Sequence, residues 1–194
     1  MLLIVFALAF LIPQASPLPR VTVVTEAGEF EVEVETKRAP LTAANFLAYV
    51  DAGLYDGGRF HRTVTVAPDN QPANEVKIAV IQAAANAARR GDYLPPIPLE
   101  RTSVTGLRHE DGTVSMARSG PDTATDEFFI CIGDQPSLDF GGARNPDGQG
   151  FAAFGRVVRG MDVVRKIHAA RADGQRLAPS VRILRAARSR EPVW

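Results

Sequence analysis

The sequence predicts a mainly β protein with about eight short antiparallel strands and two helices in one domain. Three observations predict this class. Short runs of β-branched and aromatic residues recur along the chain, turn residues separate them, and only two stretches show helical periodicity. Many short antiparallel strands favour a closed barrel or a sandwich, because closure removes open sheet edges. We expect the two helices to plug the ends of such a barrel.

The first two predicted strands show the clearest pattern. Residues 20–25 are rich in valine and threonine, and Ala27-Gly28 supplies a turn. Phe30, Val32 and Val34 then alternate with glutamates, so that one face is apolar and the other polar. This alternation is typical of an antiparallel sheet. It also indicates that the glutamates form a solvated face rather than a metal site.

The first helix is predicted after Pro40, which ends the strand pattern. Apolar residues from Phe46 to Leu54 recur at helical spacing, and Thr42 is a suitable N-cap. Further strands are predicted at 59–64, 77–82, 113–117, 127–132, 151–158 and 181–185, and the second helix at 161–169. Residues 94–100 contain three prolines and form at most an edge strand. Residues 83–92 have no clear pattern.

Composition narrows the functional classes. The 194 residues suffice for one domain with a substantial core. The 22 basic and 22 acidic residues cancel, so no global field attracts nucleic acid or an anionic membrane. The single cysteine, Cys131, excludes an internal disulfide and a cysteine-based metal site. Its apolar neighbours predict a buried small hydrophobe rather than a nucleophile.

The N-terminus carries a continuous apolar run from Leu2 to Ile12. A membrane-spanning helix needs about 20 apolar residues, so no stable span is expected. The run resembles the core of a secretory signal, with cleavage near Ala15 or Ser16, although no Lys or Arg precedes it. We therefore expect residues 1–19 to be a signal peptide of an exported (periplasmic or secreted) protein. The alternatives are an apolar segment that is retained as a membrane anchor, and a wrongly assigned start.

Two segments suggest a functional site. The first runs from Met116 to Pro121 and continues, after a polar loop, into the strand with Phe128 and Phe129. After this loop the chain returns to a strand in which at least one of the two aromatic rings is expected to be buried. The second segment is the strand at 59–64, where the cation of Arg62 lies between apolar positions. A cation beside an apolar groove indicates a candidate site.

These segments resemble the cyclophilin-type peptidyl-prolyl cis-trans isomerases in order and in content. The resemblance rests on Phe60-His61-Arg62, Gln82, the run from Met116 to Pro121, Phe128-Phe129-Ile130 and Leu138-Asp139, and it extends from Val21 to Leu184. It implies that residues 20–194 form a closed eight-stranded antiparallel β-barrel capped by two α-helices. It also implies catalysis of X-Pro bond rotation during protein folding, without metal or cofactor.

The resemblance implies specific roles. Arg62 corresponds to the principal catalytic residue, Gln82 orients it and contacts the substrate backbone, and Phe129 forms the floor of the proline pocket. Substrate contacts are implied for Phe60, Ala79, Val80, Ala117, Arg118, Leu138 and Phe151. Ala79 and Val80 stand where the family usually has Phe and Met, which predicts a shallower wall, and Phe151 stands where many members have a histidine.

The chemistry explains the residue types. Rotation about a peptide bond costs about 18–20 kcal/mol because the nitrogen lone pair is delocalised. Twisting localises that pair on the prolyl nitrogen, which can then accept a hydrogen bond from a fixed guanidinium. Arginine suits this task because it stays protonated and is rigid. We expect proline-containing segments of client proteins as partners, and a monomeric enzyme.

Other interpretations remain open at this stage. The same barrel could be a non-catalytic module that binds proline peptides in the manner of a chaperone. A hydrolase would need paired carboxylates in a cleft, and the acidic residues mostly fall on wet strand faces. Strand alternation predicts that His61 points away from Arg62 and is structural. His109 and His168 show no metal-ligand spacing.

Overall fold

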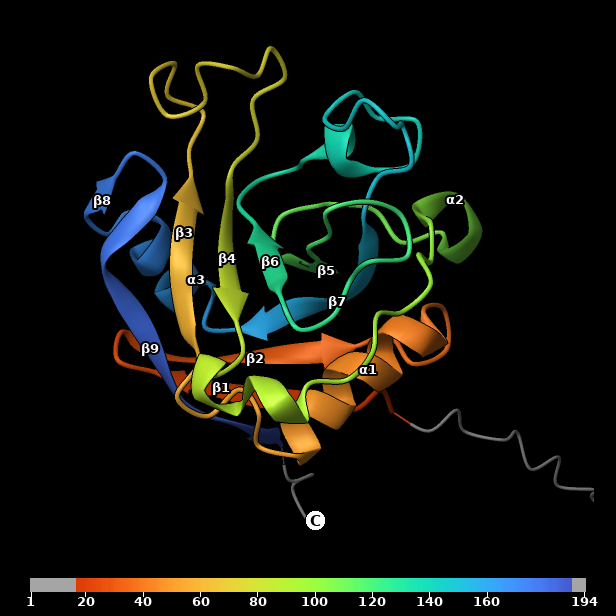
Figure 1. Ribbon diagram of the computed structural model, residues 1–194, viewed down its shortest axis with the longest axis vertical. Coiled ribbons are helices and arrows are strands. Elements are labelled where there is room, and N and C mark those ends of the chain that lie inside the picture. Colours follow the sequence, from red (N-terminus) through yellow and green to blue (C-terminus); the bar gives the residue numbers. More distant parts are fainter. Residues whose placement is uncertain (1–16, 190–194) are drawn as a thin grey trace, which may run out of the picture.

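The computed structural model describes residues 17–189, which form a β-barrel (Figure 1). Its strands are β1 (Arg20–Thr25), β2 (Gly28–Val34), β3 (Arg59–Val64), β4 (Val80–Ala84), β5 (Thr113–Met116), β6 (Phe128–Cys131), β7 (Ala152–Arg159), β8 (Ala172–Asp173) and β9 (Arg176–Arg188). Eight of them pair in the order β1-β2-β7-β5-β6-β4-β3-β9, and β9 pairs back onto β1. The two-residue β8 forms a hairpin with β9 outside this ring. The predicted closed eight-stranded antiparallel barrel is confirmed.

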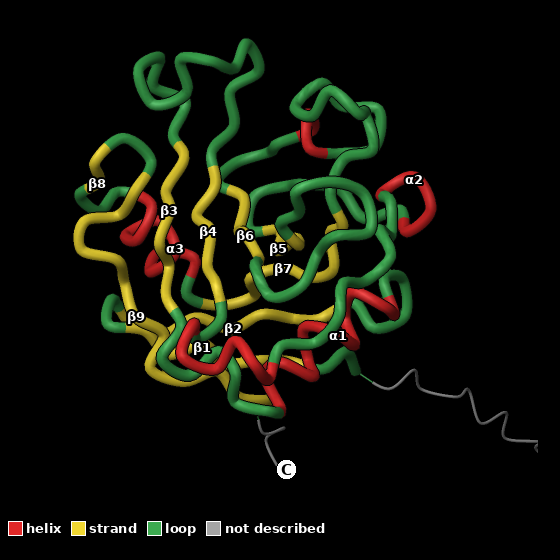
Figure 2. Tube along the Cα trace, viewed as in Figure 1, coloured by secondary structure: helices red, strands yellow, loops and turns green. Residues whose placement is uncertain are grey.

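Two helices bury side chains in the barrel core. Phe46 and Tyr49 reach it from α1 (Pro40–Asp51), and Val164 and Ile167 reach it from α3 (Met161–His168). Both helices were predicted from their apolar periodicity. The sequence did not predict α2 (Thr102–Thr105) or the 3₁₀ helices η1 (Ala87–Asp92) and η2 (Pro136–Leu138), which are too short to show a period (Figure 2). No helix within residues 17–189 has the length and apolarity needed to cross a bilayer.

The buried apolar residues form two separate clusters. The larger one fills the barrel and contains the inward-facing side chains of the strands, such as Phe30, Ile81 and Ile130. The smaller one lies on the outer face of β3, β4 and β6 and consists of Val64, Ile78, Val80, Phe129, Cys131 and Leu138. Cys131 is fully buried there, as predicted, and burial raises the pKa of its thiol. The barrel therefore carries a second apolar layer on its outside.

Two predicted strands have boundaries that differ from the structure by three or more residues. Residues 77–79 precede β4, which begins at Val80. Residues 94–100 contribute one isolated bridge, between Ile97 and Ala124, because their prolines cannot donate to a ladder. The closing strand is longer than predicted: β9 covers Arg176–Arg188, because its successive parts pair with β8, β3 and β1.

Helix α1 is capped by a distant carboxylate instead of Thr42. The N-cap residue is Ala39, and its side chain makes no capping hydrogen bond, so the predicted N-cap is wrong. The backbone N–H groups of Leu41 and Thr42 donate to the Glu100 carboxylate at 3.1 and 2.7 Å, and the Thr42 hydroxyl donates to it at 2.6 Å. A negative charge at this end also interacts favourably with the helix dipole.

We expect Glu100→Ala to lower the free energy of unfolding by about 1–2 kcal/mol, because it leaves the first-turn N–H groups of α1 without their acceptor. Chemical denaturation of the purified protein measures this difference. Glu75→Ala is a matched control, since Glu75 is exposed and has no partner among the described residues. Equal loss of stability in both variants would contradict the capping role.

Candidate active site

Arg62, Gln82 and Phe129 lie in one row across the outer face of the barrel. Arg62 on β3 is the register partner of Gln82 on β4, and Gln82 is the partner of Phe129 on β6. Adjacent strands lie about 4.8 Å apart, so residues 20 and 47 positions apart in the sequence become neighbours. The structure therefore brings together the three residues that were predicted to be catalytic.

A β-bulge in β3 sets the direction of the Arg62 side chain. The register shifts between Phe60, which pairs with Ala83, and Arg62, which pairs with Gln82. His61 is the extra residue, and its Nε2 lies 3.9 Å from the Glu127 carboxylate beside Gln82. The prediction that His61 points away from Arg62 is therefore wrong, because the bulge interrupts the strict alternation on which it relied.

Two amide oxygens hold the Arg62 guanidinium. Its Nη1 donates to Gln82 Oε1 at 2.9 Å, while Nε and Nη2 donate to Gln175 Oε1 at 2.8 and 2.6 Å. Gln175 is itself fixed, because its Nε2 donates to the Asn70 carbonyl and its own carbonyl accepts from the Thr63 N–H. Three of the five N–H donors are thus used, and one on each terminal nitrogen stays available.

The holding groups orient the guanidinium without neutralising it. Gln82 donates from Nε2 to Glu127 at 2.5 Å, so this carboxylate lies behind the amide. Burial lowers the pKa of Arg62, and the charge of Glu127 partly offsets this effect. Because the ordinary arginine pKa is so high, the side chain stays a cation at neutral pH.

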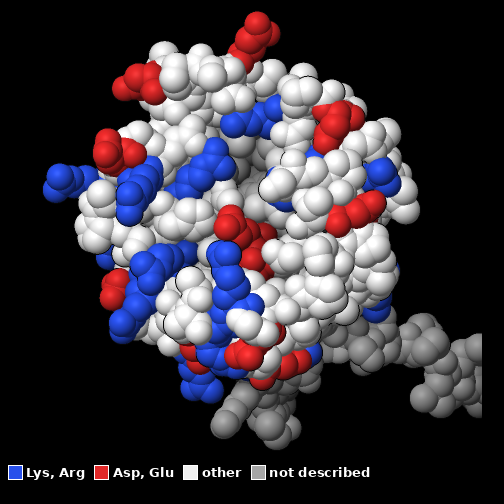
Figure 3. Space-filling view, viewed as in Figure 1, with Lys and Arg blue, Asp and Glu red and all other residues white. Residues whose placement is uncertain are grey.

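A groove of about 310 Å³, lined by both apolar and polar side chains, adjoins Arg62. It is lined by Arg62, Asn74, Ile78, Val80, Gln82, Ala117, Arg118, Phe129, Leu138, Arg144, Asn145, Pro146 and Phe151. Phe129 and Phe151 meet edge to face, with ring centroids 5.2 Å apart. Figure 3 shows the hollow on this face, with Lys and Arg side chains beside it. A smaller pocket shares Gln82, Ala117 and Arg118 with the groove and contains Asp126 and Glu127.

A buried polar chain supports the Phe129 ring from below. The His109 ring stacks on Phe129 at 5.9 Å between centroids, and it hydrogen-bonds Asp139 through Nδ1 at 2.7 Å and Ser115 through Nε2 at 2.9 Å. Burial raises the pKa of Asp139. Its hydrogen bonds and charge interaction with His109 together outweigh burial, so the pKa lies below the ordinary value. This order of groups resembles a hydrolase triad, but Ser115 is fully buried and no substrate can reach it.

Arg118 closes one side of the groove. Its guanidinium lies 5.1 Å from the centre of the Phe151 ring and forms two hydrogen bonds with Asp147, at 2.7 and 3.0 Å. The Arg118 side chain is only 2% exposed. It therefore anchors the loop at 140–150 against the groove wall, and that loop supplies several lining residues.

Two of the predicted substrate contacts are corrected by the structure. Phe60 is fully buried inside the barrel, where its ring packs against Phe30 and Phe128. Ala79 is buried beside Gln135 and does not line the groove, whereas its neighbour Ile78 does. The remaining predicted residues, Val80, Ala117, Arg118, Leu138 and Phe151, all line it.

Gln175 is the most important residue that the sequence did not reveal. It lies in the β8–β9 turn, more than one hundred positions from Arg62, in a segment that was assigned no element. Nothing in the local pattern distinguishes it from a surface glutamine. Arg144 and Asn74 were missed because they lie in long loops.

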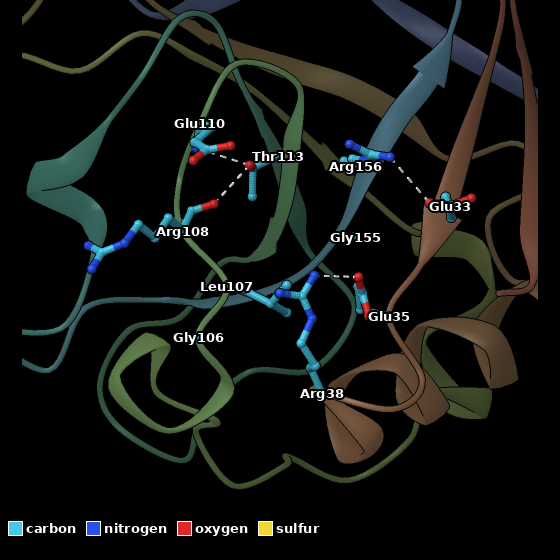
Figure 4. A pocket seen from close by; sticks show the side chains of 10 residues that line it. All are labelled: Glu33, Glu35, Arg38, Gly106, Leu107, Arg108, Glu110, Thr113, Gly155 and Arg156. Carbon is cyan, nitrogen blue, oxygen red and sulfur yellow. Dashed lines mark hydrogen bonds and ion pairs between the residues drawn. The ribbon is translucent and has the colours of Figure 1, made fainter. Parts of the chain in front are cut away.

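A larger cleft than this groove lies elsewhere and shows no comparable chemistry. It has a volume of about 470 Å³ and lies beside β2, β5 and β7 (Figure 4). Its charged side chains largely satisfy one another: Arg38 binds Glu35, and Arg156 lies 3.6 Å from Glu33. Among the described residues, no three His, Cys, Asp or Glu side chains are placed to bind a metal ion.

Comparison with known proteins agrees with this geometry. Residues 20–188 match the family model for cyclophilin type peptidyl-prolyl cis-trans isomerases. The chain belongs to this family. It is 36% identical over 144 residues to the peptidyl-prolyl cis-trans isomerase cyp18 of Streptomyces antibioticus, a match that covers 74% of this chain and 79% of the relative.

Two further members of the family are similar to this chain, one in sequence and one in structure. Peptidyl-prolyl cis-trans isomerase A of Dickeya dadantii is 36% identical over 156 residues, covering 79% of this chain and 73% of that protein. The crystal structure of a cyclophilin type peptidyl-prolyl cis-trans isomerase from Cryptosporidium parvum superimposes with a TM-score of 0.70 at 20% identity, covering 90% and 99% of the two chains. The chain is thus a peptidyl-prolyl cis-trans isomerase.

We expect Gln175→Ala to lower kcat by about tenfold or more with little change in KM, because the guanidinium loses two of its three hydrogen bonds and its fixed direction. Gln175→Glu keeps the acceptor but neutralises the cation, so kcat is expected to fall as well. Line-shape and exchange NMR on a proline peptide measures both constants.

Arg176→Gln, on the adjacent position of the same hairpin, is the control for this comparison. It removes a charge near the groove without touching the hydrogen bonds of Arg62. If Gln175→Ala retained the wild-type kcat at an unchanged melting temperature, Gln82 alone would be sufficient to hold Arg62.

Proposed function

We propose that Arg62 accelerates rotation about X-Pro bonds by donating a hydrogen bond to the prolyl nitrogen of the twisted bond. The observation that carries this role is the guanidinium held by Gln82 and Gln175 beside an aromatic-floored groove. Its remaining N–H groups are available to a substrate, and its charge is not neutralised by a contacting carboxylate. A planar X-Pro bond has no localised lone pair on nitrogen, so the interaction strengthens as the bond twists.

The apolar side chains of the groove provide the second part of the mechanism. Phe129, Leu138, Val80 and Phe151 form a surface on which a pyrrolidine ring can be held away from water while the segment before it turns. Holding one side of the bond fixed converts free rotation into a directed twist beside Arg62. In support, the Cryptosporidium parvum relative has also been crystallised in the presence of the dipeptide Ala-Pro.

Gln82 contributes in two ways to this proposal. Its Oε1 accepts from Arg62, and its Nε2 donates to Glu127, so the amide orientation is fixed from both ends. A reversed amide would place an N–H against the guanidinium, which has no acceptor. Glu127 therefore fixes the orientation of Gln82, and Gln82 fixes the orientation of Arg62.

The natural partners under this proposal are proline-containing segments of client proteins during folding. Uncatalysed X-Pro isomerisation takes tens of seconds or longer and limits folding.

We expect Arg62→Ala to lower kcat/KM by about 10²–10³-fold, the usual effect of losing one transition-state donor. Arg62→Lys retains the charge but loses the hydrogen bonds to both glutamines. Its activity is therefore expected to lie between that of wild type and that of Arg62→Ala. A protease-coupled assay on a proline peptide gives the rates.

Exchange NMR on the same peptide separates an isomerase from a module that only binds. An isomerase increases the cis–trans exchange rate, whereas a binder shifts peaks without increasing exchange. Equal exchange rates with wild type and Arg62→Ala would contradict the assignment of Arg62.

We further propose that the protein is exported and that its N-terminal segment is removed near Ala15 or Ser16. This segment lies outside the described residues, and the support is its apolar run followed by small and turn-forming residues. Intact mass measurement after expression in a secreting host is expected to show a mature chain that begins between residues 16 and 20. A chain that retains Met1 would favour the anchor alternative.

A further inference from the structure

Three arginines line the active groove, and they differ in what compensates their charge. Arg118 is neutralised by Asp147 through two hydrogen bonds, and Arg62 is held by neutral amides. Arg144 donates from Nη1 to the Val76 carbonyl at 2.7 Å and forms no ion pair with any described carboxylate. No Asp or Glu is among the residues that line this groove.

One edge of the Arg144 guanidinium has no protein partner. Its Nε and Nη2 groups make no hydrogen bond to any residue in 17–189, while Nη1 fixes the side chain to the loop before β4. Arg144 is half-buried, so its stem is packed and its direction is restricted. The free edge presents two parallel N–H donors, the arrangement that binds a carboxylate in a bidentate manner.

The charges of Arg62 and Arg144 affect each other. Burial lowers the pKa of Arg144, and the nearby charge of Arg62 lowers it further. Two cations without a contacting carboxylate beside one groove repel each other, and an anion bound between them would offset this repulsion. Arg118 in the same groove is paired with Asp147, so Arg62 and Arg144 are the two arginines of this lining without a contacting carboxylate among the described residues.

We propose that Arg144 forms a subsite for the side-chain carboxylate of an Asp or Glu that flanks the substrate proline. The inference rests on the proposed isomerase function and names the preferred substrates as proline segments with a nearby acidic residue. The adjoining pocket contains Asp126 and Glu127, so the sign of the charge reverses along the binding face. An acidic residue is therefore favoured on the Arg144 side of the proline and disfavoured on the other side.

The test uses amidated peptides with one proline, in which Glu or Gln is placed in turn at each flanking position. With wild type at low salt, kcat/KM from exchange NMR is expected to be about fivefold higher for Glu than for Gln at one or more positions on one side of the proline. High salt is expected to reduce this ratio. If the same peptides with a free C-terminal carboxylate were preferred over the amidated ones, while Glu gave no advantage over Gln, the assignment to a side chain would be overturned.

Variants of Arg144 connect the preference to this residue. Arg144→Gln is expected to bring the Glu-to-Gln ratio close to one, and Arg144→Glu to favour Lys at the same position. Arg156→Gln removes the same charge from the other cleft, which shares no residue with the groove, and is expected to retain the wild-type ratio (Figure 4).

Two results would overturn the proposal. One is a Glu-to-Gln ratio of one in wild type at every position, with normal isomerisation of the Gln peptides. The other is a preference for Glu that survives in Arg144→Gln. A wild-type enzyme that fails to isomerise the Gln peptides would instead overturn the proposed function, and the subsite with it.

Discussion

The site depends on fixing a cation without cancelling its charge. A carboxylate would orient the Arg62 guanidinium more strongly than an amide, but it would also neutralise the field that stabilises the developing lone pair in the proposed mechanism. The structure instead uses two glutamine oxygens, one from β4 and one from the β8–β9 hairpin, and places the nearest acid behind Gln82. The strand register and the position of the hairpin together place both glutamine oxygens against the guanidinium.

The barrel also needs an outer apolar layer, because this layer forms the floor of the groove. Side chains from the strands and from two helices fill the barrel interior. The groove therefore lies on the external face. Phe129 serves both as part of the outer cluster and as the floor of the groove, because its lower side is packed on His109 and its edge meets Phe151. Under the proposed function, Phe129 is both a core residue and a substrate-binding residue.

Much of the fold could be predicted from the sequence, because alternation and helical periodicity are local properties. Arg62, Gln82 and Phe129 could also be identified, since they lie in recognisable motifs. The direction of His61 could not, because one inserted residue changes the face to which all following side chains point. Phe60 was misplaced for the related reason that a motif records neighbours along the chain but not the side of the sheet that each side chain occupies.

Contacts between segments that are distant in the sequence could not be predicted either. Gln175 reaches Arg62, and Glu100 caps α1, only because the closed barrel brings remote segments together. No local pattern contains that information. The loop at 140–150 is a similar case: its composition predicts a loop, whereas its role follows from the anchoring of Asp147 by Arg118.

The pairing of β1 with β9 has a consequence for how the domain can be attached to other structures. Val21 is the register partner of Arg188, so the first and last strands meet at one edge of the barrel, and the loops that border the groove rise from the opposite edge (Figure 1). A tether joined to either strand would leave the groove facing outwards. The same catalytic face is therefore compatible with a freely diffusing protein and with one held at a surface.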